Sequence, residues 1–448
     1  MKSHRCSKLA LMTLSILGAA WFMIPLVNSV RHLCPTRPTG VPEAQAIAAW
    51  ARKYGVGCNV CHVAGYKLTG AGQKFLRQGH TMPGSDKEAN ISDFLSLTAK
   101  IRTWGKKTTV VEEARETQKT SKSSFEFHAL SLYSGGALDR GFSYFAEFYL
   151  HENEKKFTPT ASEANVSDMG DWGRSKLAEA YLAYNYNLNE DVYAGGRMGR
   201  IMPWLIHFHG GGARLDYSRP LPFTSQTQTN NPYRPFSRQY GASAFGAFKD
   251  LFAELGIVNG TGKHENIVEV ETDNKKDVYL TLDYTFDGNG SMLGAYYYKG
   301  YWPLHWFSQA ASGDKFRQYG LIGNYTFKLS PFGLDRAGGS LIGACFIGND
   351  RYKNTGGVNE DNHRSKSYFV ETQAHLFDDM LAPYFRYEWF DSNTALPNTE
   401  KYGPVLGLNW KAFNHGRFVL EYSRYKTRNN FQKYTRDEDV TLEAQFMF

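Results

Sequence analysis

Alternation with a period of two runs through the sequence from residue 93 to the C-terminus, and it constrains the fold more than any other feature. In an extended chain, Phe127, Ala129 and Ser131 point to one side, while His128 and Leu130 point to the other. Segments of this kind, rich in Tyr, Phe, Val and Leu, predict β-strands with two different faces. We expect strands at 93–104, 125–133, 177–186, 277–286, 291–299, 367–377, 381–391, 402–410, 416–425 and 437–448.

The connections between these strands alternate in length. Short, turn-rich connections are expected at 187–190, 287–290, 378–379 and 412–415, with slightly longer ones near Gly135 and Gly333. Long polar connections are expected near 105–122, 152–175, 200–238, 259–276, 301–316, 349–366, 392–401 and 427–436. With a first strand at 93–104, eight long loops and seven short turns separate sixteen strands. This asymmetry is typical of an outer-membrane β-barrel with both chain ends at the short-turn, periplasmic rim.

Composition agrees with a transmembrane antiparallel β-barrel. Mean hydropathy is −0.47, which excludes a bundle of membrane helices, because each such helix needs about 20 apolar residues. Aromatic residues make up 15% of the chain, and we attribute them to girdles at the membrane interfaces rather than to an electron-hopping chain. The net charge of +7 comes from basic residues interspersed with 44 acids, which indicates no nucleic-acid partner. A soluble β-sandwich or propeller is the alternative fold.

The N-terminus has the order of a secretory signal peptide. Lys2, Arg5 and Lys8 precede an uncharged stretch from 9 to 30. We expect cleavage after Ser29, so that 1–29 is a signal peptide and the chain is exported. An uncleaved membrane anchor is the alternative.

The strongest chemical signal is Cys58-Asn59-Val60-Cys61-His62, the Cys-x-x-Cys-His pattern of a c-type haem attachment site. Two intervening residues place both thiols along one porphyrin edge to form thioethers, and the adjacent imidazole reaches the iron. We expect one haem c attached to Cys58 and Cys61, with His62 as the proximal axial ligand. Disulfide pairing among the four cysteines left after export is the alternative. A thioredoxin-like dithiol would need a βαβ context, which this region lacks.

The second axial ligand is expected from the loop-like stretch 79–84. Met82 lies 20 residues after His62 beside a Pro-Gly turn and is the first choice, because small cytochromes often take a methionine from such a loop. His80, a vacant position and a ligand from the downstream domain are the alternatives, and Met82 could instead be a core methionine. Apolar residues at helical intervals in 44–54 and 67–79 predict two short helices around the haem. Residues 38–90 are thus predicted to form a monohaem cytochrome c-like domain before a porin-like barrel at 91–448.

The final predicted strand alternates apolar and polar residues and ends on Phe448. It resembles the C-terminal strand that the outer-membrane assembly machinery recognises. We therefore expect this machinery and outer-membrane lipid among the partners.

Residues 50–62, Trp-Ala-Arg-Lys-Tyr-Gly-Val-Gly-Cys-Asn-Val-Cys-His, resemble the haem-site signature of the fused cytochrome–porin iron oxidases of the bacterial outer membrane. The expected order of export signal, single-haem segment and barrel also resembles that family. Trp50 and Ala48 depart from the pattern, since the family usually carries Phe and Pro at these positions. The resemblance implies that a single haem takes electrons from extracellular Fe(II), or another electron donor, and passes them to a periplasmic cytochrome.

Two other functions fit the same sequence. An outward electron conduit would reduce extracellular acceptors, and a passive porin would carry the haem as a structural plug. In the long connection 200–238, His207 and His209 are interpreted as incidental histidines at an aromatic rim, with a metal or pore-constriction site as the alternative.

Overall fold

The computed structural model describes residues 48–63, 67–82, 93–152, 176–189, 191–210, 216–224, 231, 233–260, 274–302, 313–329, 337–353, 360–413, 415–428 and 433–447. The predicted signal peptide 1–29 and the terminal Phe448 lie outside the described residues. The chain divides into two compact units, Met1–Pro42 and Glu43–Phe448, and the second contains every described residue.

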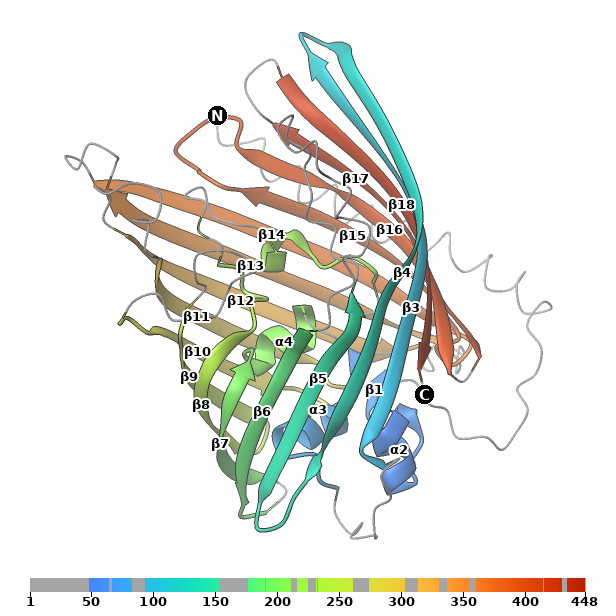
Figure 1. The fold of residues 1–448 in the computed structure, drawn as a ribbon, viewed down its shortest axis with the longest axis vertical. Coiled ribbons are helices and arrows are strands. Elements are labelled where there is room, and N and C mark those ends of the chain that lie inside the picture. Colours follow the sequence, from blue (N-terminus) through green and yellow to red (C-terminus); the bar gives the residue numbers. More distant parts are fainter. Residues whose placement is uncertain are drawn as a thin grey trace. The chain divides into compact units, whose positions relative to one another are not determined.

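Sixteen antiparallel strands of the described chain form one closed barrel (Figure 1). Each strand pairs with its neighbours in sequence, and the last strand pairs with the first to close the ring. This confirms the predicted strand number and the mainly β, closed antiparallel barrel. The strands are β3 Leu95–Glu112, β4 Arg115–Ala137, β5 Phe142–Glu152, β6 Lys176–Asn187, β7 Val192–Ile201, β8 Gln239–Phe248, β9 Leu251–Val258, β10 Asp277–Thr285, β11 Met292–Trp302, β12 Asp314–Lys328, β13 Ala337–Lys353, β14 Glu360–Leu376, β15 Leu381–Asp391, β16 Glu400–Phe413, β17 Gly416–Arg428 and β18 Lys433–Met447.

Side chains on the strands divide into an outer and an inner set. On β10, Leu280 and Leu282 are each 46% exposed on the outside. Tyr279, Thr281 and Asp283, which alternate with these leucines, are buried. Exposed leucines recur on the other strands, at Leu293, Leu321, Leu341, Leu406, Leu420 and Leu442. An apolar outer face around a polar and aromatic interior suits a barrel surrounded by lipid, because closure pairs every backbone hydrogen-bonding group.

The short turns lie at one rim, as predicted. Those at 187–190, 287–290, 378–379 and 412–415 join β6 to β7, β10 to β11, β14 to β15 and β16 to β17, and the turn after Gly135 joins β4 to β5. Both barrel ends lie at this rim, since Thr98 pairs with both Ser131 and Met447. The expected connection near Gly333 and most of the loops at 152–175 and 259–276 lie outside the described residues.

The prediction of a long loop at 105–122 is wrong. β3 and β4 continue through this stretch, and only Glu113 and Ala114, both at positive φ, separate them. Polar side chains do not stop a strand whose backbone groups are all paired with a neighbour. The Arg436–Glu116 ion pair further ties this hairpin to β18. β3 stays paired with β18 as far as Glu112, whereas β4 continues past the end of β5, whose last residue Glu152 pairs with Ala129 (Figure 1).

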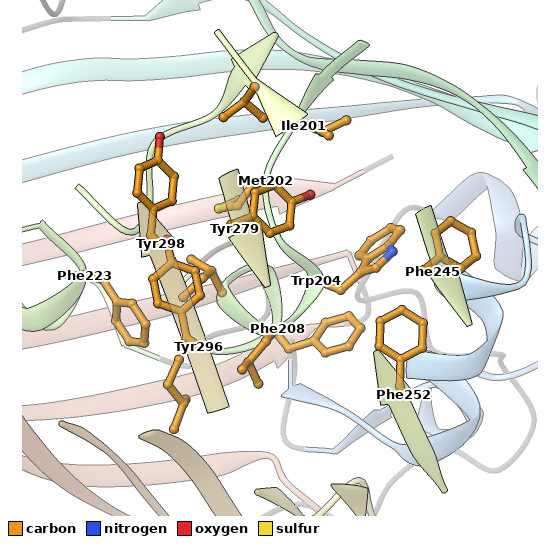
Figure 2. Packing of buried hydrophobic residues seen from close by; sticks show 14 of the residues in the cluster. Ile201, Met202, Trp204, Phe208, Phe223, Phe245, Phe252, Tyr279, Tyr296 and Tyr298 are labelled. Carbon is orange, nitrogen blue, oxygen red and sulfur yellow. The ribbon is translucent and has the colours of Figure 1, made fainter. Parts of the chain in front are cut away.

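A cluster of aromatic residues fills part of the barrel interior. Trp204 and Phe208 face Phe245 and Phe252, which come from two neighbouring strands (Figure 2). Tyr279, Tyr296, Tyr298 and Phe223 belong to the same buried cluster. The attribution of the aromatic residues to membrane girdles is therefore incomplete, because inward-facing strand positions and a segment inside the barrel also use them.

Two irregular parts of the chain accompany the barrel. The first, residues 48–82, is called the CxxCH segment and contains α2 Ala48–Tyr54, η1 Cys58–Val60, β1 His62–Val63, β2 Lys67–Leu68 and α3 Gly70–Arg77. Its two helices agree with the predicted ones. The second, residues 202–238 between β7 and β8, is called the inner segment and contains α4 Trp204–Gly210 and α5 Leu221–Thr224. No helix in the described ranges is long and apolar enough to cross a membrane.

Candidate functional site

The Cys-x-x-Cys-His motif forms a tight turn between α2 and α3. Cys58 begins η1, and its carbonyl accepts a hydrogen bond from the Cys61 amide at 3.2 Å. His62 follows at once in β1, where it lies opposite Leu68 of β2. Cys58 and Cys61 are not joined by a disulfide. The three predicted haem-attachment residues are thus held in one short stretch of backbone.

Thr69 and Gly72 hold α3 against this turn. The Thr69 hydroxyl accepts a hydrogen bond from the Gly72 amide at 3.1 Å, which caps the helix, and donates one to the Val60 carbonyl at 2.7 Å. A Cβ added at Gly72 would overlap the Cys61 carbonyl oxygen. Glycine at this position therefore allows the helix to pack directly on the motif.

The pKa of the Cys61 thiol differs from that of a redox-active dithiol. Burial, and then the charge of Cys58, raise the pKa of the Cys61 thiol to about 11. Disulfide oxidoreductases depend instead on a cysteine whose pKa is lowered. The described turn therefore lacks the lowered thiol pKa of a redox-active dithiol.

His80 lies in an aromatic setting next to the motif, with only 1% of its surface exposed. Its ring stacks on Trp50 of α2 at 4.6 Å between centroids and on Phe145 of β5 at 6.0 Å. Burial, and then the charge of Lys53, lower the pKa of His80 to about 3, so the ring is neutral. Neither ring nitrogen has a hydrogen-bond partner among the described residues, an arrangement that costs about 1–3 kcal/mol for each unsatisfied buried group.

A cavity of about 220 Å³ lies between the CxxCH segment and the barrel wall. Its lining includes all four predicted haem-binding residues, Cys58, Cys61, His62 and Met82, together with His80. The aromatic and aliphatic part of the lining is formed by Trp50, Phe75, Leu76, Phe145, Tyr181 and Trp204. The fold thus gathers the predicted residues from one segment and encloses them with strands that follow much later in the chain.

Charged groups on the barrel side of the cavity are held in pairs. Arg238 of the inner segment donates to Glu147 of β5 at 2.9 Å and to Glu179 of β6 at 3.2 Å. The imidazole of His207 lies 3.8 Å from the same Glu179 carboxylate. Burial lowers the pKa of His207 against the opposing effect of Glu179, so this ring also tends to be neutral.

One buried ion pair anchors the CxxCH segment to the barrel. Arg77, near the end of α3, contacts the Asp283 carboxylate on β10 at 2.7 Å, and both side chains are almost fully buried. The Arg77 guanidinium also lies 3.7 Å from the ring centroid of Phe252 on β9. Charge pairing and a cation–π contact therefore satisfy this guanidinium inside the barrel.

Further anchors reach the short-turn rim and the opposite wall. The Gly70 amide donates to the Gly288 carbonyl at 3.1 Å, and Gln73 donates to the Gly290 carbonyl at 3.1 Å. Lys67 donates to Thr326 and, at 2.8 Å, to Ser340 across the barrel. Burial lowers the pKa of Lys67 to about 7, although Glu371 and Asp287 oppose the shift.

The Trp50 indole completes the attachment by donating to the Gly135 carbonyl at 2.8 Å. The segment therefore occupies the barrel mouth at the short-turn rim, as the position of the chain ends predicts.

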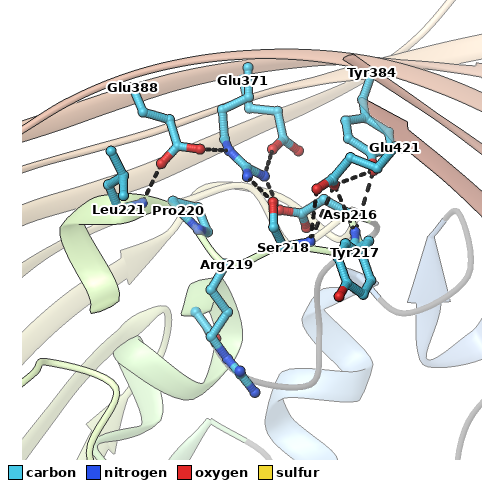
Figure 3. Close-up of polar contacts among 12 residues, drawn as sticks. Asp216, Tyr217, Ser218, Arg219, Pro220, Leu221, Glu371, Tyr384, Glu388 and Glu421 are labelled. Carbon is cyan, nitrogen blue, oxygen red and sulfur yellow. Dashed lines mark hydrogen bonds and ion pairs between the residues drawn. The ribbon is translucent and has the colours of Figure 1, made fainter. Parts of the chain in front are cut away.

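The inner segment is pinned to the far wall through its backbone. Glu421 of β17 accepts hydrogen bonds from the amides of Tyr217 at 3.0 Å and Ser218 at 3.2 Å, and Glu388 of β15 accepts one from the Leu221 amide (Figure 3). The Tyr384 hydroxyl donates to Glu421 at 2.6 Å. These bonds fix the path of the inner segment through its main chain, and the side chain of Ser218 adds a contact by accepting from Arg386 at 2.7 Å.

Arg386 of β15 lies at the centre of this network and is fully buried. Its guanidinium contacts Asp216, Glu371 at 3.1 Å and Glu388 at 2.7 Å. In Figure 3 the side chain of Arg219 points away from these carboxylates, and Arg219 lines the cavity. The network thus fixes one wall of the cavity.

The donor set around the cavity fits a c-type haem. Two thiols, two imidazoles and a thioether from residues 58–82 line one space. Four side chains of the lining are cationic: Lys100, Arg219, Arg417 and Arg238, of which Arg238 is paired with Glu147 and Glu179. Such side chains suit the carboxylates of a porphyrin. Besides both nitrogens of His80, the Trp204 indole nitrogen and one Glu179 oxygen are buried there without a hydrogen-bond partner in the described residues. Unpaired polar atoms around one cavity are what a bound polar group would satisfy.

The interpretation of His207 and His209 as rim residues is wrong. Both lie on α4 inside the barrel, because the connection between β7 and β8 folds inward. His209 is paired on both sides, with the Leu205 carbonyl and the Asn324 amide oxygen, each at 2.9 Å. Across the described ranges, no three His, Cys, Asp or Glu side chains are grouped so as to hold a metal ion.

Several residues of the site were not singled out in the sequence, notably Lys67, Arg77 and Arg386. A signal did exist for Arg386, since Arg386 and Glu388 alternate with aromatic residues on a predicted strand and must face the interior together. Lys67 and Arg77 carry no such signal, because their partners lie on strands more than 200 residues later.

Comparison with known proteins supports the barrel alone. No protein-family model matches the chain, and no curated protein sequence matches it significantly. Among solved structures, the chain is similar to an anion-selective porin from Comamonas acidovorans, with a TM-score of 0.51, 12% identity, and coverage of 79% of this chain and 99% of that one.

Two further solved porin-like structures show comparable coverage. OmpF of Salmonella typhi, in a complex with daunomycin, has a TM-score of 0.49 and 13% identity over 79% of this chain and 97% of that one. The outer membrane channel DcaP of Acinetobacter baumannii has a TM-score of 0.45 and 11% identity over 79% of this chain and 97% of that one. At such low identity it is the fold that is shared: this chain contains a closed, sixteen-stranded, porin-like β-barrel over its described residues.

Proposed function

We propose that the protein is an outer-membrane barrel that carries a single haem c in its periplasmic mouth and moves electrons across the membrane. Cys58 and Cys61 would hold the haem covalently, and His62 would be its proximal axial ligand. The observation that carries the proposal is the cavity that these side chains share with the inner wall of the barrel. The apolar outer face of the strands supports the membrane location.

A haem bound here supplies a one-electron redox centre. The residues of the chain attach it, exclude water and balance charge. Trp50, Phe145 and Tyr181 form the dry part of the cavity. Arg238, Glu147 and Glu179 keep the opposite charges of the wall paired, which limits the electrostatic cost of burying a further charged group.

The proposed electron donor is extracellular Fe(II), and this choice rests on the resemblance of residues 50–62 to the fused iron oxidases. Each Fe(II) ion would give up one electron and become Fe(III), and a periplasmic cytochrome would take that electron at the short-turn rim. The ferric product is insoluble near neutral pH and would stay outside the cell. In the alternative, an outward conduit, electrons would flow in the opposite direction, from the periplasm through the haem to extracellular acceptors.

A passive porin with the haem as a structural plug is the second candidate function, and the porin-like fold favours it. Contacts inside the barrel indicate a narrow passage. Arg77 of the CxxCH segment binds Asp283 on one wall, and Glu421 on another wall binds the inner segment. Both irregular segments therefore occupy the space through which a solute would pass.

Haem attachment is tested by a denaturing gel stained for haem peroxidase activity. The wild-type band should stain, and the double variant Cys58→Ala and Cys61→Ala should not. Cys345→Ala, which changes an exposed cysteine on β13, is the matched control and should stain like wild type. An unstained wild-type band would end the proposal.

The direction of electron flow and the rival porin function need a second experiment. Redox titration combined with stopped-flow mixing should show rapid reduction by Fe(II), and planar-bilayer recordings should show little ion current. Slow reduction by Fe(II) together with rapid oxidation by extracellular acceptors would favour the outward conduit. Large steady currents with no redox response would favour the passive porin. Heat-modifiable gel migration and strand-dominated circular dichroism test the barrel itself.

A further inference from the structure

Besides His62, four imidazole or thioether side chains line the cavity: His80, Met82, His207 and Met447. His207 belongs to the inner segment and lies 3.8 Å from the Glu179 carboxylate, and one of its ring nitrogens is buried without a hydrogen-bond partner in the described residues. Met82 is only partly buried, and Met447 is the last residue of β18. His80 differs from these three, because it is almost completely buried and both its ring nitrogens are unpaired among the described residues.

We propose that His80 is the second axial ligand of the haem iron and that the barrel holds its ring in position. The proposal rests on the proposed function, which supplies the haem. Iron ligation requires an imidazole with an unpaired ring nitrogen, and it would satisfy a nitrogen of His80 that the described residues leave unpaired.

Three aromatic rings pack around His80, which lines the cavity. Trp50 covers one face and Phe145 stacks at a longer distance, with interplanar angles of 28° and 22°. Phe75 meets the ring edge-on, with centroids 5.6 Å apart. Because Trp50 is hydrogen-bonded to Gly135 and Phe145 belongs to β5, the barrel wall sets the orientation of this imidazole.

The backbone of His80 is held as firmly as its ring. Its amide donates to the Phe75 carbonyl at 2.9 Å, and its carbonyl accepts from the Tyr54 hydroxyl at 2.5 Å. With φ at 61°, His80 is in the left-handed region, directly after Gly79, which is also left-handed at 75°. Non-glycine residues keep such a conformation only where the surroundings impose it.

Two imidazole ligands lower the reduction potential of a haem relative to an imidazole and a thioether. The inference therefore predicts a low-potential centre. Fe(II) remains able to reduce such a centre near neutral pH, because precipitation of the ferric product keeps the donor strongly reducing. Fe(II) would become a poor electron donor in acid, because Fe(III) stays dissolved there.

The test uses absorption and electron paramagnetic resonance spectra of the full-length ferric protein. His80→Gly should convert a low-spin spectrum to a high-spin one, and added imidazole should restore the low-spin form. Glycine suits the left-handed backbone at this position, so the variant should fold. Met82→Leu is the matched control and should leave the spectrum and the potential unchanged, whereas His80→Met should raise the potential.

The opposite pattern would overturn the inference, with Met82→Leu becoming high-spin and the wild type showing a sulfur-to-iron charge-transfer band. If His80→Gly does not fold, the wild-type resonance spectrum still decides between two imidazoles and an imidazole with a thioether. If the wild-type band stains for haem but the spectrum of His80→Gly is unchanged, His80 is not the ligand and the proposed function still holds. An unstained wild-type band defeats the proposed function and this inference together.

Discussion

The CxxCH segment and the inner segment both occupy the barrel interior, but the barrel holds them in different ways. Wall carboxylates bind the main chain of the inner segment, as Glu421 does at Tyr217 and Ser218, in addition to side-chain contacts such as that of Arg238 with Glu147. The CxxCH segment is held mainly by its own side chains, above all Arg77 and Lys67. The backbone of the inner segment is thus fixed to the barrel wall. The CxxCH segment instead contacts the wall mainly through side chains, as a bound ligand would. A short segment of this kind gains from a large apolar group to pack against, which a covalent haem would supply.

The largest effect is expected from Arg386→Met, which breaks the anchor of the inner segment. The change leaves the buried carboxylates of Asp216, Glu371 and Glu388 without their shared cation. Loss of one partner of a buried charge cluster costs about 3–5 kcal/mol, so the free energy of unfolding in urea should fall by that amount. The free energy of unfolding of Arg386→Lys should lie between those of wild type and Arg386→Met. A loss well under 1 kcal/mol would show that the network is not what holds this segment.

A somewhat smaller effect is expected from Arg77→Met, which acts on the CxxCH segment. Asp283 becomes a lone buried carboxylate but can take up a proton, so the loss should be about 3 kcal/mol, at the lower end for a broken buried pair. The change should appear as protease cleavage within 48–82 while the barrel stays heat-modifiable. The double variant Arg77→Met and Asp283→Leu should recover much of the loss. Cleavage at wild-type rates would contradict the anchoring role.

Lys67 should make the attachment of the CxxCH segment depend on pH. Its folded-state pKa of about 7 lies below its unfolded value of 10.5, so the unfolded state binds more protons between these values and stability rises with pH. Between pH 7 and 8 the gain should be about 1 kcal/mol. The measurement is the difference in unfolding free energy between wild type and Lys67→Met at each pH, which removes other titrations. A constant difference across this range would refute the assignment.

The smallest effect is expected from Lys74→Ala. Lys74 pairs with Asp191 at 3.1 Å, but both side chains are well exposed, at 39% and 59%. Exposed pairs contribute about 0–1 kcal/mol because water and salt screen them, so the change should fall within about 0.5 kcal/mol of wild type. Comparison with Arg77→Met, three residues further along α3, then measures how much burial adds to one ion pair.

The barrel was largely predictable from sequence, because alternation and turn residues are local properties. The strand from Leu381 to Asp391 was predicted with the bounds that the structure shows. The length of β3 and β4 was not, since Lys106 and Lys107 look like loop residues until their partners Asp437 and Glu438 on β18 are known. Polarity identifies the end of the apolar band, whereas pairing decides the end of the strand.

The candidate site was predictable only where it is continuous in sequence. The spacing of Cys58, Cys61 and His62 identifies them in the sequence. The prediction of Met82 as second ligand is untested, and the later proposal for His80 competes with it. Burial separates Met82 from His80, and burial depends on Phe145 of the barrel, which no local pattern connects to residue 80. The inward path of the inner segment likewise depends on Glu388 and Glu421, more than 160 residues downstream.

The closing strand has a consequence for biogenesis. Glu443, Gln445 and Met447 of β18 line the cavity, and β18 joins β3 only when the ring closes. The cavity therefore has no complete wall until the last strand is in place. An exported chain that has not yet inserted must carry its CxxCH segment without that wall. The proposed haem would therefore be attached before the barrel closes around it, so that the finished barrel would not need an opening wide enough to admit a haem.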